Sequence, residues 1–188
     1  MERSSIENIL EVFKMISNLT EETYKTIAQN KDTLITWKDS LLQSFKNEVA
    51  LNKENMSGAD KEEAKNLETT LVDWYEDIIS GDTGDEFWKR QWNVGLKYLA
   101  DGVKLDMLIG MMSFLQSKFA EKAFENYPPE EALKIYQAFK SITDAVLAVI
   151  VEGHLDLYIN AIEKMSGIKR PVIERMASLE CKKILEEG

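Results

Sequence analysis

Apolar side chains recur every three or four residues along almost the whole chain, and this helical periodicity constrains the fold more than any other feature. In the first segment they stand at positions 6, 9, 10, 13 and 16, which is the spacing of one helical face. The 188 residues include 9 glycines and only 3 prolines, so the sequence offers few of the turns that a β-sheet requires. We therefore predict an all-α fold of about eight helices, one for each periodic segment.

Turn and capping signals divide the periodic segments. Thr20, which is followed by Glu21 and Glu22, is expected to cap a helix that ends near Asn30, because hydroxyl side chains and early acidic residues stabilise a helix start. Asp32 is expected to cap the next helix. Further breaks are predicted at the polar stretch 52–60, at 81–84, at Gly102, at 127–129 and at Gly167, with Pro171 opening the last helix.

The charge balance and the single histidine disfavour several classes of function. With 33 acidic against 23 basic residues the net charge is −10, which disfavours binding to nucleic acid and to anionic lipid. One histidine, His154, and one cysteine, Cys181, are too few for a His/Cys zinc site or an intramolecular disulfide. No glycine-rich phosphate loop is present. We expect a protein that is not an enzyme and has no metal site.

Two features concern the cellular location. The longest wholly apolar run, Ala145 to Val151, has seven residues, which is too few to span a bilayer. Acidic residues at positions 2 and 7 argue against a signal peptide. These features predict a cytoplasmic protein that has no membrane contact.

The helix predicted at 85–101 has two adjacent apolar stripes. Together they cover roughly half of its circumference, so we expect this helix to contact the core and also a second surface or a pocket. The stripes consist of Trp88, Trp92, Gly95, Leu96 and Leu99, and of Phe87, Val94 and Tyr98.

The following helix carries a stripe of mostly small side chains, which allows another helix to approach closely. Its members are Asp106, Gly110, Ser113 and Ser117. The stripe fits tight packing inside one chain and equally a contact between subunits. Because the run 145–151 is apolar on every side, it should be buried on every side, and a single domain of this size encloses few such helices. We therefore predict a homodimer built from the helices 103–124 and 141–165.

The order and spacing of several short patterns resemble those of the sensor-globin and protoglobin family. They are Leu19-Thr20-Glu21-Glu22, similar to the start of the family's first globin helix; 39–45 (DSLLQSF), similar to a pattern on its second helix; 88–103 (WKRQWNVGLKYLADGV), similar to the helix of its heme ligand; and 160–167 (NAIEKMSG) with 168–185, similar to its chain end. The resemblance implies a single globin-like domain over residues 1–188. It implies an extra N-terminal helix at 1–18, a globin core at 19–167 and a C-terminal helix at 168–188.

Two positions depart from the family pattern. The family's proximal heme ligand is a histidine, and Tyr98 stands at the matching position. The family's distal tyrosine follows the phenylalanine of the second helix, whereas Lys46 follows Phe45 here. Tyrosine can ligate ferric heme as a phenolate, as in catalases, but it must first lose its proton. The resemblance implies a pocket in this region, and its candidate residues are Tyr98, Lys46, Phe45, Phe87, Trp92, Val94 and Met111.

Three functions are compatible with the resemblance. The first is a heme-free regulatory domain that acts as a dimer and responds to a small apolar ligand or a protein partner, similar to the globin-like domains of stressosome regulators. The second is a heme protein that senses or carries oxygen through Tyr98 or another non-histidine ligand. The third is a structural dimerisation module without a ligand. We expect the first, with no cofactor. His154 could supply a replacement ligand, although a lone histidine on an apolar face is more typical of a core residue bonded to the backbone.

Overall fold

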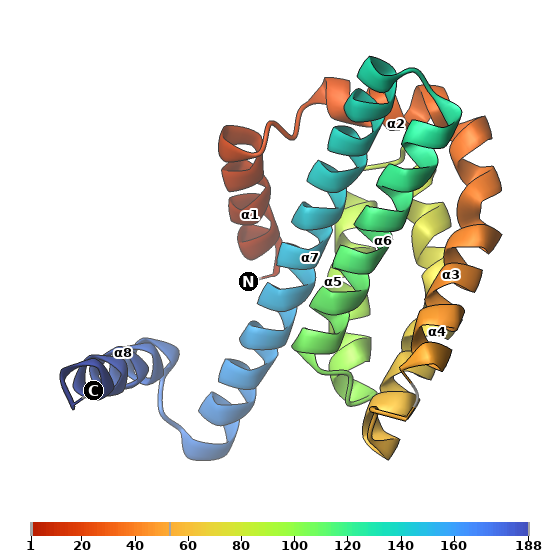
Figure 1. The fold of residues 1–188 in the computed structure, drawn as a ribbon. Helices are drawn as coiled ribbons and strands as arrows, with labels where there is room; N and C mark the ends of the chain where they lie inside the picture. The colour runs from red at the N-terminus through yellow and green to blue at the C-terminus, as the bar shows by residue number, and fades with distance from the viewer. Residues whose placement is uncertain (1, 53, 188) are drawn as a thin grey trace.

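The chain folds into helices joined by short turns, and no strand occurs among the residues that the structure describes. The computed structural model describes residues 2–52 and 54–187, with side chains from residue 6 onward. Figure 1 shows the helices in chain order: α1 (Glu2–Ile16), α2 (Glu21–Leu34), the 3-10 turn η1 (Ile35–Trp37), α3 (Lys38–Leu51), α4 (Gly58–Ile79), α5 (Asp85–Ala100), α6 (Leu105–Asn126), α7 (Pro129–Ser166) and α8 (Arg170–Glu187). The predicted all-α fold is confirmed.

The 38-residue helix α7 is the axis of the fold. It packs against α1, α2, α5 and α6, and Figure 1 shows it running between α1 and α6 along the length of the molecule. By length and composition alone α7 could cross a membrane. Its packing against α1, α2, α5 and α6 explains this apolar composition without a membrane, because a central core helix needs apolar residues on several faces.

Aromatic side chains join the helices at one end of the core. Phe119 of α6 and Phe139 of α7 stack with ring centroids 3.8 Å apart, and Trp37 meets Phe119 edge-on at 5.3 Å. The buried hydroxyl of Tyr75 donates to the Leu34 carbonyl at 2.8 Å. Each aromatic pair adds about 0.5–1.5 kcal/mol beyond the area that it buries, so this cluster holds α2, α4, α6 and α7 together.

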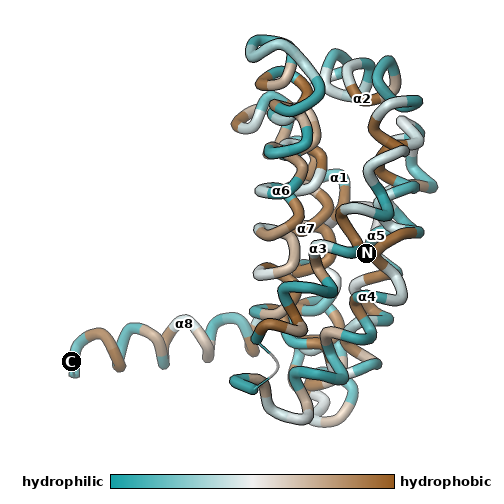
Figure 2. Tube along the Cα trace, turned by 45° about the vertical axis from the view of Figure 1, so that its right-hand side comes forward, coloured by the Kyte–Doolittle hydropathy of each residue, from teal (hydrophilic) through white to brown (hydrophobic). Residues whose placement is uncertain are grey.

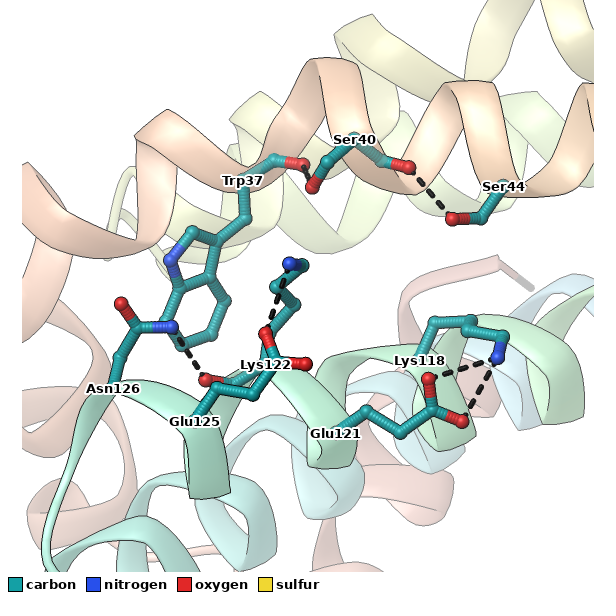
Figure 3. Close-up of polar contacts among 8 residues, drawn as sticks. All are labelled: Trp37, Ser40, Ser44, Lys118, Glu121, Lys122, Glu125 and Asn126. Atoms are coloured by element: carbon teal, nitrogen blue, oxygen red, sulfur yellow. Dashed lines mark hydrogen bonds and ion pairs between the residues drawn. The ribbon is translucent and has the colours of Figure 1, made fainter.

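Several side-chain polar contacts of α3 and of α6 are local, joining residues three or four positions apart. Figure 3 shows that the Ser40 and Ser44 hydroxyls of α3 bond to carbonyls three and four residues earlier, and that lysines of α6 pair with glutamates three residues further on. The contacts between these two helices are apolar, such as Phe45 against Phe114, with centroids 6.0 Å apart. Apolar burial is therefore what joins α3 to α6.

The start of α2 follows the prediction, but the predicted cap at Asp32 is wrong. The Thr20 backbone N–H donates to the Thr23 hydroxyl at 3.1 Å, at the start of α2. Asp32 lies inside α2, which continues to Leu34 and passes through η1 into α3 without an extended residue. A side-chain cap requires such an extended residue, and here the 3-10 turn changes the chain direction instead.

The loop predicted at 52–60 is shorter than expected because α4 begins at Gly58. Ser57 and Asp60 form a reciprocal capping box, with the Asp60 N–H on the Ser57 hydroxyl at 3.2 Å and the Ser57 N–H on the Asp60 carboxylate at 2.9 Å. The Ser-x-x-Asp pattern is the sequence signal for this start. Residue 53, within the predicted loop, lies outside the described residues.

Glu63 of α4 holds the turn between α5 and α6 in place. Gly102 adopts a positive φ of 75°, which glycine tolerates without strain. The carboxylate of Glu63, whose side chain is 7% exposed, accepts a hydrogen bond from the Lys104 N–H at 3.2 Å and pairs with its ammonium at 3.1 Å. This buried carboxylate satisfies a backbone donor at the start of α6.

The apolar run at 145–151 is not buried on every side within one chain. Ala145, Val146, Val149 and Ile150 are buried, whereas residues 147, 148 and 151 remain half-buried. The described elements of one chain therefore leave part of this run uncovered, and its complete burial by a second chain stays a prediction.

Helix α8 projects from the body of the molecule, and none of its residues is buried. Figure 2 shows it extending away from the other helices with hydrophobic and hydrophilic residues intermixed. An ion pair between Arg170 and the buried Asp156 joins its first turn to α7. Gly167, at a φ of 73°, ends α7 as predicted.

Candidate functional site

Helix α5 presents one face to α7 and another to α4. On the first face Gly95 lies against α7 so closely that an added Cβ would stand 2.8 Å from the Ile150 carbonyl oxygen. Trp92 packs beside Gly153 of α7 on the same side. Both tryptophans of this stripe, Trp88 and Trp92, are buried. The expectation that α5 contacts the core and a second feature therefore holds, with α7 as the core side.

The second face of α5 borders a cleft with a volume of about 570 Å³, which lies between α4 and α5. Side chains rather than close backbone contacts join the two helices along this cleft. The lining residues are Thr70, Asp73, Trp74, Glu76 and Asp77 of α4, and Arg90, Gln91, Val94, Lys97 and Tyr98 of α5. Two of the predicted pocket residues, Val94 and Tyr98, are among them.

A hydrogen bond between Tyr98 and Thr70 spans the two helices at one end of the cleft. Their hydroxyl oxygens lie 2.7 Å apart. The Thr70 hydroxyl also reaches the Leu67 carbonyl at 3.1 Å. When Thr70 donates its one proton to that carbonyl, the Tyr98 hydroxyl donates to Thr70. Burial raises the pKa of the Tyr98 hydroxyl above its usual 10.0; the bond to Thr70 lowers it and the Asp101 carboxylate raises it further.

A cluster around Asp77 spans the helices at the other end. The Asp77 carboxylate accepts a hydrogen bond from the Arg90 guanidinium at 2.7 Å and another from the Gln91 amide nitrogen at 2.8 Å. Gln91 is 1% exposed. Its amide oxygen is buried and has no hydrogen-bond partner among the described residues. Buried polar atoms are rarely left without a partner, so this oxygen is the most unusual atom of the cleft.

The other predicted pocket residues do not gather at this cleft. Phe45 and Met111 line a second cleft of about 480 Å³ between α3, α4 and α6. Phe87 is fully buried and meets Trp88 edge-on at 4.9 Å. Lys46 lies at the surface, where its ammonium pairs with Glu68 at 2.8 Å. The single pocket implied by the resemblance is thus divided among two clefts, the core and the surface.

His154 lies in the core beneath α5. It is 1% exposed, the Gly95 carbonyl accepts a hydrogen bond from its imidazole, and burial lowers its pKa. Its Nε2 atom has no partner within the part of the chain that the structure describes. The residue therefore has the surroundings of a neutral core histidine, and it does not line the α4–α5 cleft.

Sequence reasoning did not find Thr70, Asp77 or Gln91. Gln91 stands between the two apolar stripes of α5, so its burial follows from its place on the helix. A polar residue at such a place was the available signal, because a buried amide needs partners. Thr70 and Asp77 belong to an ordinary polar face of α4 in the sequence, and only the packing of α4 against α5 gives them a role.

The chain is similar to known proteins both in sequence and in fold. The model of the Protoglobin family matches residues 10–158, which includes the whole cleft but not the segment 160–167. Among solved structures, the globin domain of the Geobacter sulfurreducens globin-coupled sensor is similar, with a TM-score of 0.62 and 17% identity, over 77% of this chain and 96% of that chain. A comparison with curated proteins found no match.

The structural likeness, at this low identity, establishes a globin fold. The family match covers most of the chain and confirms the resemblance inferred from the short sequence patterns. This chain belongs to the protoglobin family.

Proposed function

We propose that this chain is a heme-free globin domain with a regulatory role in the cytoplasm, acting as a homodimer and without enzymatic activity. It responds to a small ligand or to a protein partner. The observation that carries the proposal is the hydrogen bond between Tyr98 and Thr70, which joins α5 to α4 at the position where the family pattern has its heme ligand.

The residues of this chain do not fit heme. Globins normally hold heme iron through a neutral histidine, and a tyrosine at that position must ionise before it can bind ferric iron. Burial raises the pKa of Tyr98 and thus opposes ionisation. Its hydroxyl is already engaged with Thr70 of the facing helix. Two cationic side chains, Arg90 and Lys97, line the cleft, and Arg90 is already paired with Asp77 at the other end.

His154 does not offer a substitute ligand. Its imidazole bonds to the Gly95 carbonyl, and Gly95 belongs to the face of α5 that packs on α7. The cleft between α4 and α5 lies on the neighbouring face of α5 and is lined without His154. We therefore derive no chemistry through heme for this chain.

Two exposed stripes support the homodimer. On α6, the residues at positions 106, 110, 113 and 117 are all exposed, so the small stripe is not used for packing inside the chain. On α7, Leu155, Tyr158, Ile162 and Met165 are 47%, 56%, 46% and 90% exposed. Both sets repeat with spacings of four and three residues. This repeat is typical of helices that pack against a second helix pair in a bundle.

Heme titration with absorbance detection tests the heme-free state. We expect the wild-type chain to show no saturable Soret band, and we expect the same for Tyr98→Phe. The Tyr75→Phe variant is the matched control, because it removes the hydroxyl of another buried tyrosine that does not line the cleft.

A stoichiometric Soret band in the wild type and in Tyr75→Phe that is lost in Tyr98→Phe would overturn the proposal. The chain would then be a tyrosinate heme protein. Tyr98→His separates the two causes of exclusion: heme uptake by this variant identifies the missing ligand as the cause, and continued exclusion identifies the shape of the space between α4 and α5. Both results are compatible with a heme-free wild type.

A further inference from the structure

We propose that the ion pair between Asp156 of α7 and Arg170 of α8 is a latch that sets the direction of α8, and that the packing of α5 against α7 controls this latch. Helix α8 is then a movable arm that carries the state of the domain to its surroundings. The inference rests on the proposed regulatory role, because it names the element and the residues through which that role is exerted.

Helix α8 has little apart from the latch to hold its direction. None of its residues is buried, and Figures 1 and 2 show it projecting from the end of α7, away from the other helices. The apolar burial that fixes the other helices is therefore small for α8. Among the described residues, the side-chain polar contacts between α8 and α7 come from Arg170, in the first turn of α8.

The latch belongs to a small polar cluster at the joint between the two helices. Asp156 is 6% exposed. Its carboxylate pairs with the Arg170 guanidinium and accepts a hydrogen bond from the Asn160 amide at 2.9 Å. The guanidinium also lies 3.3 Å from the Asp156 carbonyl oxygen. Because the donors of a guanidinium lie in one plane, these contacts are directional, and they fix one orientation of the start of α8 relative to α7.

The joint can also take other directions. The Arg170 Nε atom is buried and has no hydrogen-bond partner among the described residues, and a buried donor without an acceptor lowers the stability of the closed latch. The turn between the helices contains Gly167, at a φ of 73°, and glycine adopts negative as well as positive φ values readily. Opening the ion pair therefore frees α8 to change its direction.

One turn of α7 contacts both α5 and the latch. The His154 imidazole donates to the Gly95 carbonyl of α5, and Gly153 lies beside Trp92 of the same helix. Asp156 follows two residues after His154 and pairs with α8. Rigid secondary elements carry coupling between separate contacts, so a displacement of α5 at Gly95 reaches Asp156 through a single helical turn.

The direction of α8 can be measured from its own cysteine. Cys181 is the one cysteine of the sequence and is exposed on α8. The variant Gln137→Cys adds a second labelling position at an exposed residue of α7. Pulsed electron spin resonance on the doubly spin-labelled full chain then gives the distance between positions 137 and 181. An excess of unlabelled chain ensures that only distances within one chain are read. We expect a single narrow distribution.

Opening the latch should change this distribution. Asp156→Asn and Arg170→Gln each remove the ion pair, and each should broaden the distribution or move its centre by more than its original width. The matched control is Glu163→Gln, which makes the same acid-to-amide change in the exposed pair with Lys169 beside the joint. Exposed ion pairs contribute little, so the control should keep the original distribution.

A displacement of α5 should have the same effect as opening the latch. In Gly95→Ala the added Cβ would stand 2.8 Å from the Ile150 carbonyl oxygen of α7, so the two helices must shift. In the control Gly153→Ala the added Cβ would lie 3.6 Å from Trp92, an ordinary contact distance. We expect a changed 137–181 distribution in Gly95→Ala and an unchanged one in Gly153→Ala.

Four results would each overturn the proposal: a broad distribution before the latch is changed, an unchanged distribution in Arg170→Gln, a changed distribution in Glu163→Gln, or equal distributions in Gly95→Ala and Gly153→Ala. Circular dichroism checks that each variant is folded. If Asp156→Asn does not fold, Arg170→Gln decides, because it alters only the exposed helix α8. Heme uptake and dimer mass are measured separately, so failure of the proposed function and failure of this inference are distinguishable.

Discussion

The hydroxyl oxygens of Tyr98 on α5 and Thr70 on α4 lie 2.7 Å apart, and their hydrogen bond ties the two helices together at one end of the cleft. At the far end of the same cleft, Asp77 makes the equivalent link to Arg90 and Gln91. The two links set the width of the cleft. A molecule that enters between them must either fit this width or break one of the links, so the cleft is a place where ligand binding can be coupled to the spacing of α4 and α5.

The Tyr98→Phe variant should be less stable than the wild type by about 1 kcal/mol at neutral pH, because it loses one buried hydrogen bond. Its stability should also respond less to alkaline pH. The pKa of Tyr98 is raised in the folded chain, so the native state keeps a proton that the unfolded chain releases above about pH 10. The stability that this group contributes is present below pH 10 and is lost as the pH rises through the native pKa.

Urea unfolding at several pH values above 10 measures this contribution. The slope of the unfolding free energy against pH should be shallower in Tyr98→Phe by about 1.4 kcal/mol per pH unit. Tyr136→Phe is the control, since this half-buried tyrosine lies outside both the cleft and the proposed dimer stripes, and it should keep the wild-type slope. Equal slopes in wild type and Tyr98→Phe would contradict a buried, neutral Tyr98.

The sequence predicts the helices well and the cleft poorly, for a physical reason. Helical periodicity and the glycines at 102 and 167 are local signals, and both glycines lie at the predicted breaks, each with a positive φ. The Asp32 error arises because α2 continues through η1 into α3, so the chain has no extended residue there for a side-chain cap. Thr70 and Asp77 depend on which face of α4 meets α5, a long-range relation that local patterns do not contain. For Gln91, the helical pattern of α5 predicts that the side chain is buried, but it does not predict that Asp77 is the partner.

Replacing Gly95 by Ala should destabilise the fold by about 1–2 kcal/mol. The new methyl group would stand 2.8 Å from the Ile150 carbonyl oxygen and 3.1 Å from the Ile150 Cα, and backbone atoms cannot move aside without shifting α7. Overpacking of this kind costs about 1–3 kcal/mol, while alanine returns up to about 1 kcal/mol of helix propensity.

The Gly153→Ala variant separates these two effects. The atoms nearest to the new methyl group would belong to Trp92, at 3.6 Å, which is an ordinary contact distance. The gain in helix propensity should therefore leave Gly153→Ala at least as stable as the wild type. Thermal unfolding followed by circular dichroism compares the two variants. A Gly95→Ala variant as stable as Gly153→Ala would show that α5 and α7 are less closely packed than described.

Replacing Glu63 by Ala should cost about 2 kcal/mol, because it leaves the Lys104 N–H without its carboxylate acceptor and removes the ion pair. Glu63→Gln keeps an acceptor oxygen and should lose roughly half as much. The exposed neighbour Glu62 provides the control variant Glu62→Ala, which should change little. Chemical unfolding gives the free energies, and amide exchange at 103–106 should accelerate in Glu63→Ala. Equal stability of the Glu63 and Glu62 variants would remove the structural role of this carboxylate.

Placing a charged residue in the proposed dimer interface on α7 tests the dimer. Leu155 is 47% exposed and lies on the repeat with Tyr158 and Ile162, whereas Leu157 is 40% exposed and lies off that repeat. Leu155→Glu should shift the chain to monomer, because the twofold axis of a homodimer brings two like charges close together. Leu157→Glu should remain dimeric. Gly110→Trp should also dissociate the dimer, because its Cβ would meet no atom of its own chain within 4 Å while the indole would obstruct the close approach of a second helix. Light scattering at micromolar concentration measures the mass of each variant. A monomeric wild type, or a Leu155→Glu variant that stays dimeric, would contradict a dimer built on α6 and α7.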